Sequence, residues 1–213
     1  MSFNLNPEKA LIFRIVHRDN VPWILDHGLH CRSSENFDSN YRTIGNPELI
    51  EKRGHCQVPI PPGGTLNDYI PFYFTPFSIM MLNIKTGYGG VTRVPNEEIV
   101  IFVSSLRTLM ERGIPFVFTD RHAYLVSAQY SSDPKDLDRI DWKILQNRDF
   151  KNDPNDLGKK ERYQAEALVH RFLPIDALLG IGCQIKGVQE VLEKALLERQ
   201  IQLKVVVQPT WYF

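Results

Sequence analysis

The stretch KKERYQAEALV, at residues 159–169, joins a cationic segment to an apolar strand that we predict over residues 165–172. Glu166 lies between two alanines inside that strand. An acidic side chain there needs a reason, because burying an unpaired carboxylate costs several kcal/mol. The structural reason is an ion pair with Arg162 or Arg171. The chemical one is that a carboxylate in a cleft can stabilise a cationic sugar transition state, and the residues alone leave both readings open.

Strands and helices alternate on both sides of this stretch without a regular repeat. Apolar or β-branched runs predict strands, and capped or amphipathic runs predict helices. The predicted strands cover residues 11–16, 68–74, 98–104, 115–119, 165–172, 178–185 and 202–208. The predicted helices run from Asp19 or Asn20 to Gly28 and over residues 47–53, 78–83, 105–112, 120–128 and 188–200. This order predicts an α/β or α+β fold around a mixed sheet.

Two polar segments interrupt this order. Residues 30–68, apart from the short helix, are rich in proline, glycine and scattered charges, and residues 146–163 predict an exposed, charged loop. Loops of this length often carry function. Pro71 lies inside the predicted strand at 68–74, which indicates that this strand starts there or lies at a sheet edge.

Composition predicts one globular domain over residues 1–213. Hydrophobic residues make up 43% and charged residues 23%, which is typical of a folded protein with a sizeable core. Lys and Arg together number 25, as do Asp and Glu, so the formal net charge is zero. A nucleic-acid coat protein usually has a basic excess. Any contact with nucleic acid should therefore be local, as at the cations of residues 159–162.

The cysteines and histidines form no metal-binding pattern, so we expect no metal. Cys31, Cys56 and Cys183 form no CxxC pair, and the six histidines form no HExxH motif. Unpaired cysteines favour a reduced, intracellular compartment. The first residues are unlike a signal peptide, and no run approaches the ~20 apolar residues of a membrane span. We expect a cytoplasmic protein without a membrane anchor.

Polar and aromatic side chains near strand ends are further candidates for a site. His17 and Asn20 follow the first strand, and His122 follows the strand at 115–119. Capping or solvent exposure explains each of these as readily. Tyr73 and Phe77 belong to an aromatic run that can fill the core or can stack on a base or a nicotinamide ring.

Four segments stand in order along most of the chain: FRIVHRDNVPWILDHG at residues 13–28, GGTLNDYIPFYF at 63–74, FTDRHA at 118–123 and RYQAEALV at 162–169. Together they resemble the DarT family of DNA ADP-ribosyltransferase toxins. The resemblance implies an ADP-ribosyltransferase fold, in which a split mixed central sheet with flanking helices holds NAD in its cleft. It also implies that ADP-ribose is transferred from NAD, the co-substrate, onto a base of single-stranded DNA, releasing nicotinamide.

The resemblance also implies roles for single residues. Glu166 matches the catalytic glutamate of the family. His17 and Asn20 match a first-strand motif associated with NAD binding, and His122 matches a TDxH segment that lines the site. Tyr73 is expected to contact the cofactor.

The loop at 146–165 is expected to recognise the acceptor, with Lys159, Lys160 and Arg162 holding DNA phosphates. The implied partners are single-stranded DNA and a macrodomain antitoxin that removes the modification, so the chain is expected to act as a toxin that blocks replication. We expect a monomer.

The target base is the point at which this sequence departs from the family. Thymine-modifying members are expected to carry an arginine where this chain has Phe77, and Arg14 replaces a frequent histidine. Thymine's ring nitrogen carries a proton that must be removed, whereas guanine's exocyclic amine needs less help and a purine can stack on an aromatic ring. We therefore prefer guanine, which Phe77 would contact, over thymine. The sequence also leaves open an RNA- or protein-directed transferase and a catalytically silent module that binds NAD or nucleic acid.

Overall fold

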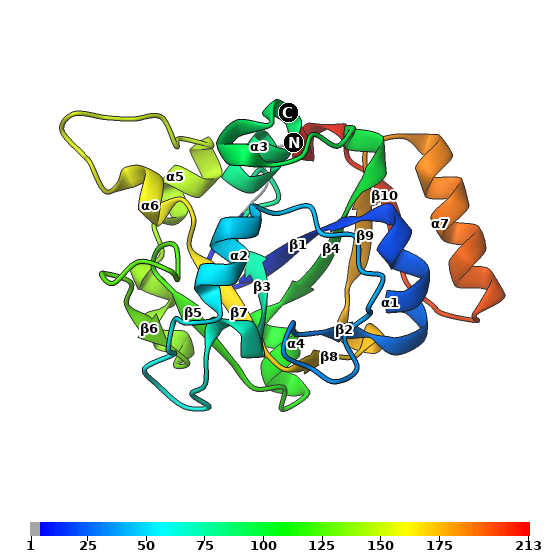
Figure 1. The fold of residues 1–213 in the computed structure, drawn as a ribbon, viewed down its shortest axis with the longest axis horizontal. Coiled ribbons are helices and arrows are strands. Elements are labelled where there is room, and N and C mark those ends of the chain that lie inside the picture. The colour runs from blue at the N-terminus through cyan, green and yellow to red at the C-terminus, as the bar shows by residue number, and fades with distance from the viewer. Residues whose placement is uncertain (1–4) are drawn as a thin grey trace.

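An eight-stranded mixed sheet runs through the molecule in the order β10-β9-β4-β1-β3-β7-β5-β6 (Figure 1). The computed structural model describes residues 5–213, so residues 1–4 of the expected domain lie outside the described residues. The strands of this sheet are β1 (Leu11–His17), β3 (Tyr69–Tyr73), β4 (Ile99–Ser105), β5 (Phe116–Thr119), β6 (Tyr130–Ser131), β7 (Glu166–His170), β9 (Gly180–Cys183) and β10 (Val205–Val207). The pair β9–β10 is parallel and β1–β4 is antiparallel, so the predicted mixed sheet is confirmed. β2 (Leu29–His30) and β8 (Phe172–Leu173) form a separate small sheet.

Helices flank the sheet. They are α1 (Val21–His27), α2 (Pro47–Arg53), α3 (Ile79–Thr86), α4 (Leu106–Glu111), α5 (Trp142–Asn147), α6 (Lys159–Arg162) and α7 (Lys186–Glu198). Figure 1 shows α7 beside β10 and β9, and α2 in front of the strands at the centre of the sheet. Short 3-10 turns link several of these elements. Within residues 5–213, no helix is long and apolar enough to cross a membrane.

The sheet is split between β1 and β3. β1 pairs with β4 along its whole length, but it pairs with β3 through Phe13 and Tyr73 alone. Beyond that pair, the Arg14 side chain crosses the gap, and its Nη1 donates to the carbonyl oxygen of Pro71 at 2.8 Å. The N–H and C=O of one strand residue point to the same neighbour. The backbone nitrogen of Pro71, which carries no hydrogen, therefore points toward the split. No hydrogen bond between strands is lost there.

This corrects the prediction for Pro71. β3 is neither an edge strand nor a strand that begins at the proline, since it lies between β1 and β7 and starts at Tyr69. A proline is accepted inside the sheet here because the sheet is open on that side.

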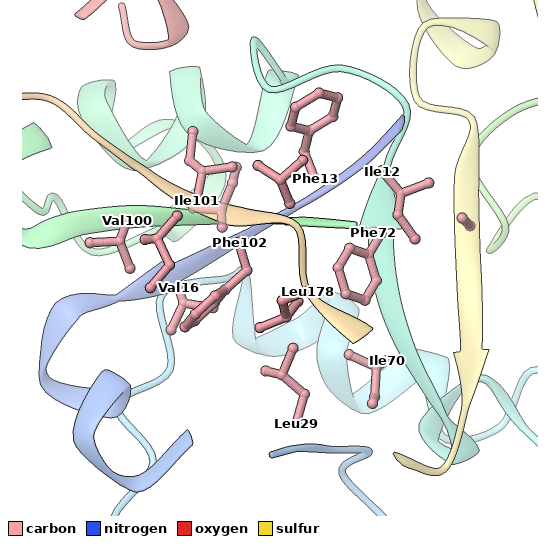
Figure 2. Packing of buried hydrophobic residues seen from close by; sticks show 14 of the residues in the cluster. Ile12, Phe13, Val16, Leu29, Ile70, Phe72, Val100, Ile101, Phe102 and Leu178 are labelled. Carbon is pink, nitrogen blue, oxygen red and sulfur yellow. The ribbon is translucent and has the colours of Figure 1, made fainter. Parts of the chain in front are cut away.

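The core lies where β1, β3 and β4 pack side by side. Figure 2 shows apolar side chains from these strands in contact, and Ile12, Phe13 and Phe102 are completely buried. Every residue of β4 is buried, which is why its sequence is a continuous apolar run rather than an alternating one. Each such side chain contributes about 1.5–3 kcal/mol by leaving water. β1 and β3, the strands on the two sides of the split, therefore belong to one packed core.

Most predicted elements are confirmed, and α2 has the predicted bounds. The helix expected over residues 120–128 is wrong, because this segment consists of turns. Asp120 exchanges backbone and side-chain hydrogen bonds with Gln129, and the Thr119 hydroxyl donates to the carbonyl oxygen of Arg121. These local bonds compete with helix formation. The loop expected at 146–163 contains the end of α5 and all of α6.

Candidate active site

Glu166 begins β7 and lies opposite Tyr73 of β3, next to the split. Its side chain is 2% exposed. The carboxylate accepts hydrogen bonds from Arg53 Nη1, at 3.2 Å to Oε1 and 2.9 Å to Oε2, and from the backbone N–H of Ala123 at 3.0 Å. His122 Nδ1 lies 3.1 Å from Oε1. The cation that pairs with Glu166 is therefore Arg53, not Arg162 or Arg171.

Arg53 is the functional residue that the sequence did not reveal. It ends α2, a helix that begins with Pro47 and is capped by the Asn46 side chain, which accepts from the N–H of Leu49 at 3.0 Å. The short helix was predictable. No local pattern indicates that its last side chain reaches a carboxylate 113 residues further along the chain.

A cavity of about 200 Å³ opens beside this pair. Its lining includes Arg14, Arg53, Tyr73, His122, Gln164 and Glu166, from both sides of the split and from α2. Arg14 Nε and Arg53 Nη2 are buried and have no hydrogen-bond partner among residues 5–213. A buried donor without an acceptor costs about 1–3 kcal/mol. Both arginines line the cavity, which suits a ligand rich in oxygen acceptors.

His122 is held on both sides. Its backbone N–H donates to the carbonyl oxygen of Glu161 at 3.1 Å, and its Nδ1 accepts from the N–H of Tyr124 at 3.2 Å. Burial lowers the pKa of His122, Arg53 lowers it further, and Glu166 opposes them. Nδ1 thus faces both the N–H of Tyr124 and the carboxylate of Glu166.

Tyr73 lines the cavity with its side chain half-buried. Its hydroxyl lies 3.6 Å from the sulfur of Met80. Burial, with the charge of Glu166, raises the pKa of Tyr73, so its hydroxyl stays protonated. The structure thus brings Tyr73, His122 and Glu166 together.

The structure does not bring His17 and Asn20 into the cavity lining. The buried His17 ring lies 3.0 Å from Glu98 through Nε2, and its Nδ1 accepts from the N–H of Asp19. The Asn20 side chain donates to the carbonyl of Arg42 at 2.9 Å and accepts from its N–H at 2.8 Å. Residues 43–46 after Arg42 line the cavity, so Asn20 fixes a cavity wall rather than reaching into it.

Phe77 also lies outside the lining. Its ring stacks on Phe213 with centroids 3.8 Å apart, and the Arg148 guanidinium lies 4.3 Å from the ring centroid. The hydroxyl of Tyr163 donates to the backbone carbonyl of Phe77. The structure places Phe77 in an aromatic cluster beside the loop.

The three cations expected to hold DNA differ in their surroundings. Lys159 Nζ lies 3.0 Å from Asp149, and Arg162 lies 2.7 Å from Asp156, so both are paired within the chain. Lys160 is exposed and has no ion pair among the described residues. Within residues 5–213, no group of histidine, cysteine and acidic side chains could hold a metal ion.

Known proteins are similar to this chain over nearly its whole length. The sequence profile described as "DarT: ssDNA thymidine ADP-ribosyltransferase, DarT" matches residues 13–213. A DNA ADP-ribosyl transferase of Escherichia coli O127:H6 (strain E2348/69 / EPEC) is 55% identical over 212 residues, covering 100% of this chain and 97% of that protein. A DNA ADP-ribosyl transferase of Thermus sp. (strain 2.9) is 34% identical and covers 97% of this chain and 98% of its own length.

Solved structures give the same result. The structure of Thermus sp. 2.9 DarT in complex with ADP-ribosylated ssDNA matches with a TM-score of 0.89 at 32% identity, over 100% of both chains. That of the same protein in complex with NAD+ matches with a TM-score of 0.84 at 32% identity, over 97% of this chain and 99% of that one. The split sheet and its buried glutamate define an enzyme of the DNA ADP-ribosyltransferase class. The chain belongs to the DarT family.

Proposed function

We propose that this chain transfers ADP-ribose from NAD+ onto a base of single-stranded DNA, with Glu166 as the catalytic residue. The observation that carries the proposal is the buried Glu166 carboxylate, fixed by Arg53, at the wall of a cavity that contains two unsatisfied donors. The similar Thermus DarT structures hold ADP-ribosylated ssDNA and NAD+, which supports both substrates.

The cavity fits NAD+, because a dinucleotide offers phosphate and ribose oxygens to unpartnered guanidinium groups. We propose that Arg14, Arg53, Tyr73 and His122 hold it. Asn20, expected to bind NAD directly, is instead proposed to act through Arg42, which it holds by two hydrogen bonds at the start of the segment at 42–46. His17, also expected to bind NAD, is proposed to act through Glu98, which lies 3.6 Å from Arg42.

NAD+ supplies the ADP-ribosyl group, and nicotinamide leaves. The Glu166 carboxylate stabilises the positive charge that develops on the sugar, and its fixed position means that little reorganisation is needed. It also accepts the proton that the attacking base nitrogen loses. The free Nη2 of Arg53 donates to an oxygen of the base or the sugar.

We propose thymine as the acceptor base, in place of the guanine that the sequence favoured. Guanine rested on Phe77 replacing an arginine and on its stacking with the base, but Phe77 packs against Phe213 away from the cavity lining. Arg53 supplies an arginine at Glu166, and its guanidinium can stabilise negative charge on a thymine that loses its ring proton. The description of the matching family, which names thymidine, supports the same base.

Transfer of labelled ADP-ribose tests these proposals. NAD+ labelled in the adenosine half is offered with mixed and homopolymeric DNA oligonucleotides, RNA and a protein mixture, and products are identified by mass spectrometry. We expect ADP-ribosyl-thymidine from DNA with the wild type and none with Glu166→Gln. A guanine adduct would contradict thymine as the target base. Transfer to RNA or protein alone would contradict DNA as the acceptor. No transfer to any acceptor overturns the catalytic role and favours a silent NAD-binding module.

We also propose that residues 1–213 form one domain that acts as a monomeric toxin in the cytoplasm, countered by a macrodomain antitoxin. Expression in bacteria should stop DNA synthesis with the wild type but not with Glu166→Gln, and co-expression of a macrodomain hydrolase that removes ADP-ribose should restore growth. Light scattering of the purified chain tests the monomer.

A further inference from the structure

The segment between α5 and α6 is held by ion pairs and by one aromatic side chain, Phe150, which packs against Tyr163 and Phe213. None of residues 146–158 is buried, and the first buried side chain after them is Lys159. Ordering so many residues costs about 1–2 kcal/mol each in backbone entropy, which exposed polar residues alone do not offset. Phe150 anchors the middle of the segment in the aromatic cluster, and ion pairs connect the rest of it to α6.

Those contacts form an ionic staple, defined by Asp141, Asp149, Asp153, Asp156, Lys159 and Arg162. Lys159 Nζ lies 3.0 Å from Asp149 and 3.6 Å from Asp153, and its side chain is 10% exposed. Arg162 binds both oxygens of Asp156, at 3.0 and 2.7 Å, and its Nε donates to Asp141 at 3.3 Å. Two cations of α6 thus bind four carboxylates, that of Asp141 at the N-terminal cap of α5 and three in the segment that follows α5.

The staple reaches the proposed active site through α6. A helix of one turn is not stable by itself, so α6 depends on what holds it. The carbonyl oxygen of Glu161, in α6, accepts from the N–H of His122. Gln164 lines the cavity, and Glu166 follows two residues later. Displacing α6 therefore displaces both His122 and the start of β7.

We propose that Arg162, with Lys159, is a positioning residue that holds α6, and hence His122 and Glu166, rather than a contact to DNA phosphate. The proposal rests on the function proposed above. A guanidinium bound through both donors to one carboxylate would have to leave that partner to bind phosphate, exposing two acids to the DNA. The lowered pKa of Asp156, caused first by its hydrogen bonds with Arg162, agrees with a tight mutual pair.

Lys160 provides the matched comparison. It lies on the same turn, between the two staple cations, but its side chain is exposed and unpaired among the described residues. We therefore assign the contact of this turn with a DNA phosphate to Lys160. Lys160→Ala should lower DNA affinity and reduce the salt slope by about 0.7, the value for one phosphate on a single strand.

A reciprocal exchange tests the proposal. Arg162→Asp and Asp156→Arg should each lower the DNA transfer rate at least about tenfold and increase protease cleavage within residues 148–158, because each removes a bidentate pair. Made in an Asp141→Asn background, the double variant Asp156→Arg/Arg162→Asp should recover to within about threefold of that background, since the pair is rebuilt with reversed charges and no second carboxylate repels it. If the single variants do not fold, Asp156→Asn, which leaves Arg162 in place, should give a weaker form of the same loss.

The outcomes separate the staple from a DNA contact. Recovery in the double variant, with the salt slope of DNA binding unchanged in Asp156→Asn, supports positioning. A double variant as inactive as Arg162→Asp, with a salt slope reduced as in Lys160→Ala, overturns it. If wild type modifies no DNA at all, the proposed function fails. The cleavage pattern of 148–158 and hydrolysis of NAD+ without DNA then still decide whether the staple orders α6.

Discussion

At the scale of single residues, the central feature is the mutual dependence of Arg53 and Glu166. Both side chains are nearly inaccessible, at 11% and 2% exposure. A buried ion pair adds little net stability, because the desolvation of both charges offsets their attraction, but removing one partner leaves a buried charge unpaired. The pair therefore constrains both positions strongly. Its presence is explained by the chemistry proposed above for the carboxylate.

Removing Arg53 alone should be costly. We expect Arg53→Ala to lower the free energy of unfolding by about 3–5 kcal/mol, because Glu166 loses its cation while remaining buried. The double variant Arg53→Ala/Glu166→Gln should be closer to the wild type, since no charge is then unpaired. Urea unfolding followed by circular dichroism measures both. Equal losses in the single and the double variant would contradict the coupling.

Changing Glu166 alone should affect both the reaction and the fold, because Arg53 then keeps a buried charge without its carboxylate. Glu166→Gln keeps the shape and one acceptor for the N–H of Ala123, but it lacks the charge that stabilises the sugar. We expect the transfer rate to fall by about 10²–10³-fold, the usual effect of losing a preorganised electrostatic group. Initial rates with labelled NAD+ measure this, with an unfolding curve as the control for structure. A rate within threefold of the wild type would exclude the catalytic role.

Acid should destabilise the protein through His122. Its pKa in the folded state lies below the ordinary value of 6.5, so between the two values the unfolded chain binds more protons and stability rises with pH. The contribution is complete above about pH 6.5 and is lost as the pH falls below it. We expect the wild type to lose more stability than His122→Asn when unfolding is measured from neutral to mildly acid pH. Parallel losses in both proteins would refute this assignment.

The sequence revealed one half of the central pair and not the other. Glu166 stands out because a carboxylate interrupts an apolar strand, which is a local signal. Arg53 lies on a polar helix whose arginines and lysines look alike in sequence, and its role depends on a contact across the fold. For His17 the sequence suggested more than the structure shows. Its place at a strand end predicted a contact with a ligand, but its ring nitrogen Nε2 lies 3.0 Å from the carboxylate of Glu98 instead.

At the scale of elements, α2 lies in front of the central strands and is fixed mainly by contacts at its two ends. None of its residues is buried, so little apolar packing holds it to the sheet. The Asn46 cap and the Arg53 ion pair fix its two ends instead. This makes the position of Arg53 sensitive to local helix stability, in contrast to Glu166, whose strand is built into the sheet.

Weakening the α2 cap should therefore affect activity more than stability. Asn46→Ala should remove about 1 kcal/mol of helix stability, displace Arg53 and lower the transfer rate several-fold. Ser105→Ala removes the equivalent cap of α4, outside the cavity lining, and should lower the unfolding temperature while leaving the rate near that of the wild type. Rates and thermal unfolding of the two variants, measured side by side, check this. Equal rate losses in the two variants would show that the cap of α2 matters no more for the transfer rate than the cap of α4.

Elements defined by local chemistry were predictable, and those defined by pairing were not. Pro47 and Asn46 mark the start of α2 without reference to the rest of the chain. The turns at 120–128 have helix-like composition, but Asp120 binds Gln129 instead of continuing a helix. Pro71 signalled an irregularity in the sheet, yet only the arrangement of β1 and β3 shows that the irregularity is a split.

At the scale of the whole molecule, the zero net charge results from cations and acids that pair within the fold. Arg42, Arg53 and Arg162 all bind carboxylates of this chain, as does Lys159. Exposed cations without an ion pair among the described residues, such as Arg32, Lys151 and Lys160, remain available to a nucleic acid, but attraction over long distances is weak in a neutral protein. The molecule is suited to holding a few nucleotides, not to coating a strand.

DNA binding should accordingly depend weakly on salt. For single strands each phosphate contact contributes about −0.7 to the slope of log K against log salt concentration, so about three contacts predict a slope near −2. Fluorescence anisotropy of a labelled oligonucleotide across a salt series measures it. A slope steeper than about −4 would indicate a basic surface that the fold does not show.

The distance in sequence between Arg53 and Glu166 also has a consequence for the synthesis of the protein on the ribosome. The two residues are 113 positions apart, which at about 5–20 residues per second corresponds to roughly 6–20 s of translation. During that interval the nascent chain has its arginine but no carboxylate, and β9 and β10 are still to be made. With Glu166 as the proposed catalytic residue, we expect a truncated product that ends before residue 166 to leave the DNA of the cell unmodified. Synthesis itself thus delays the reactive site until most of the sheet can form.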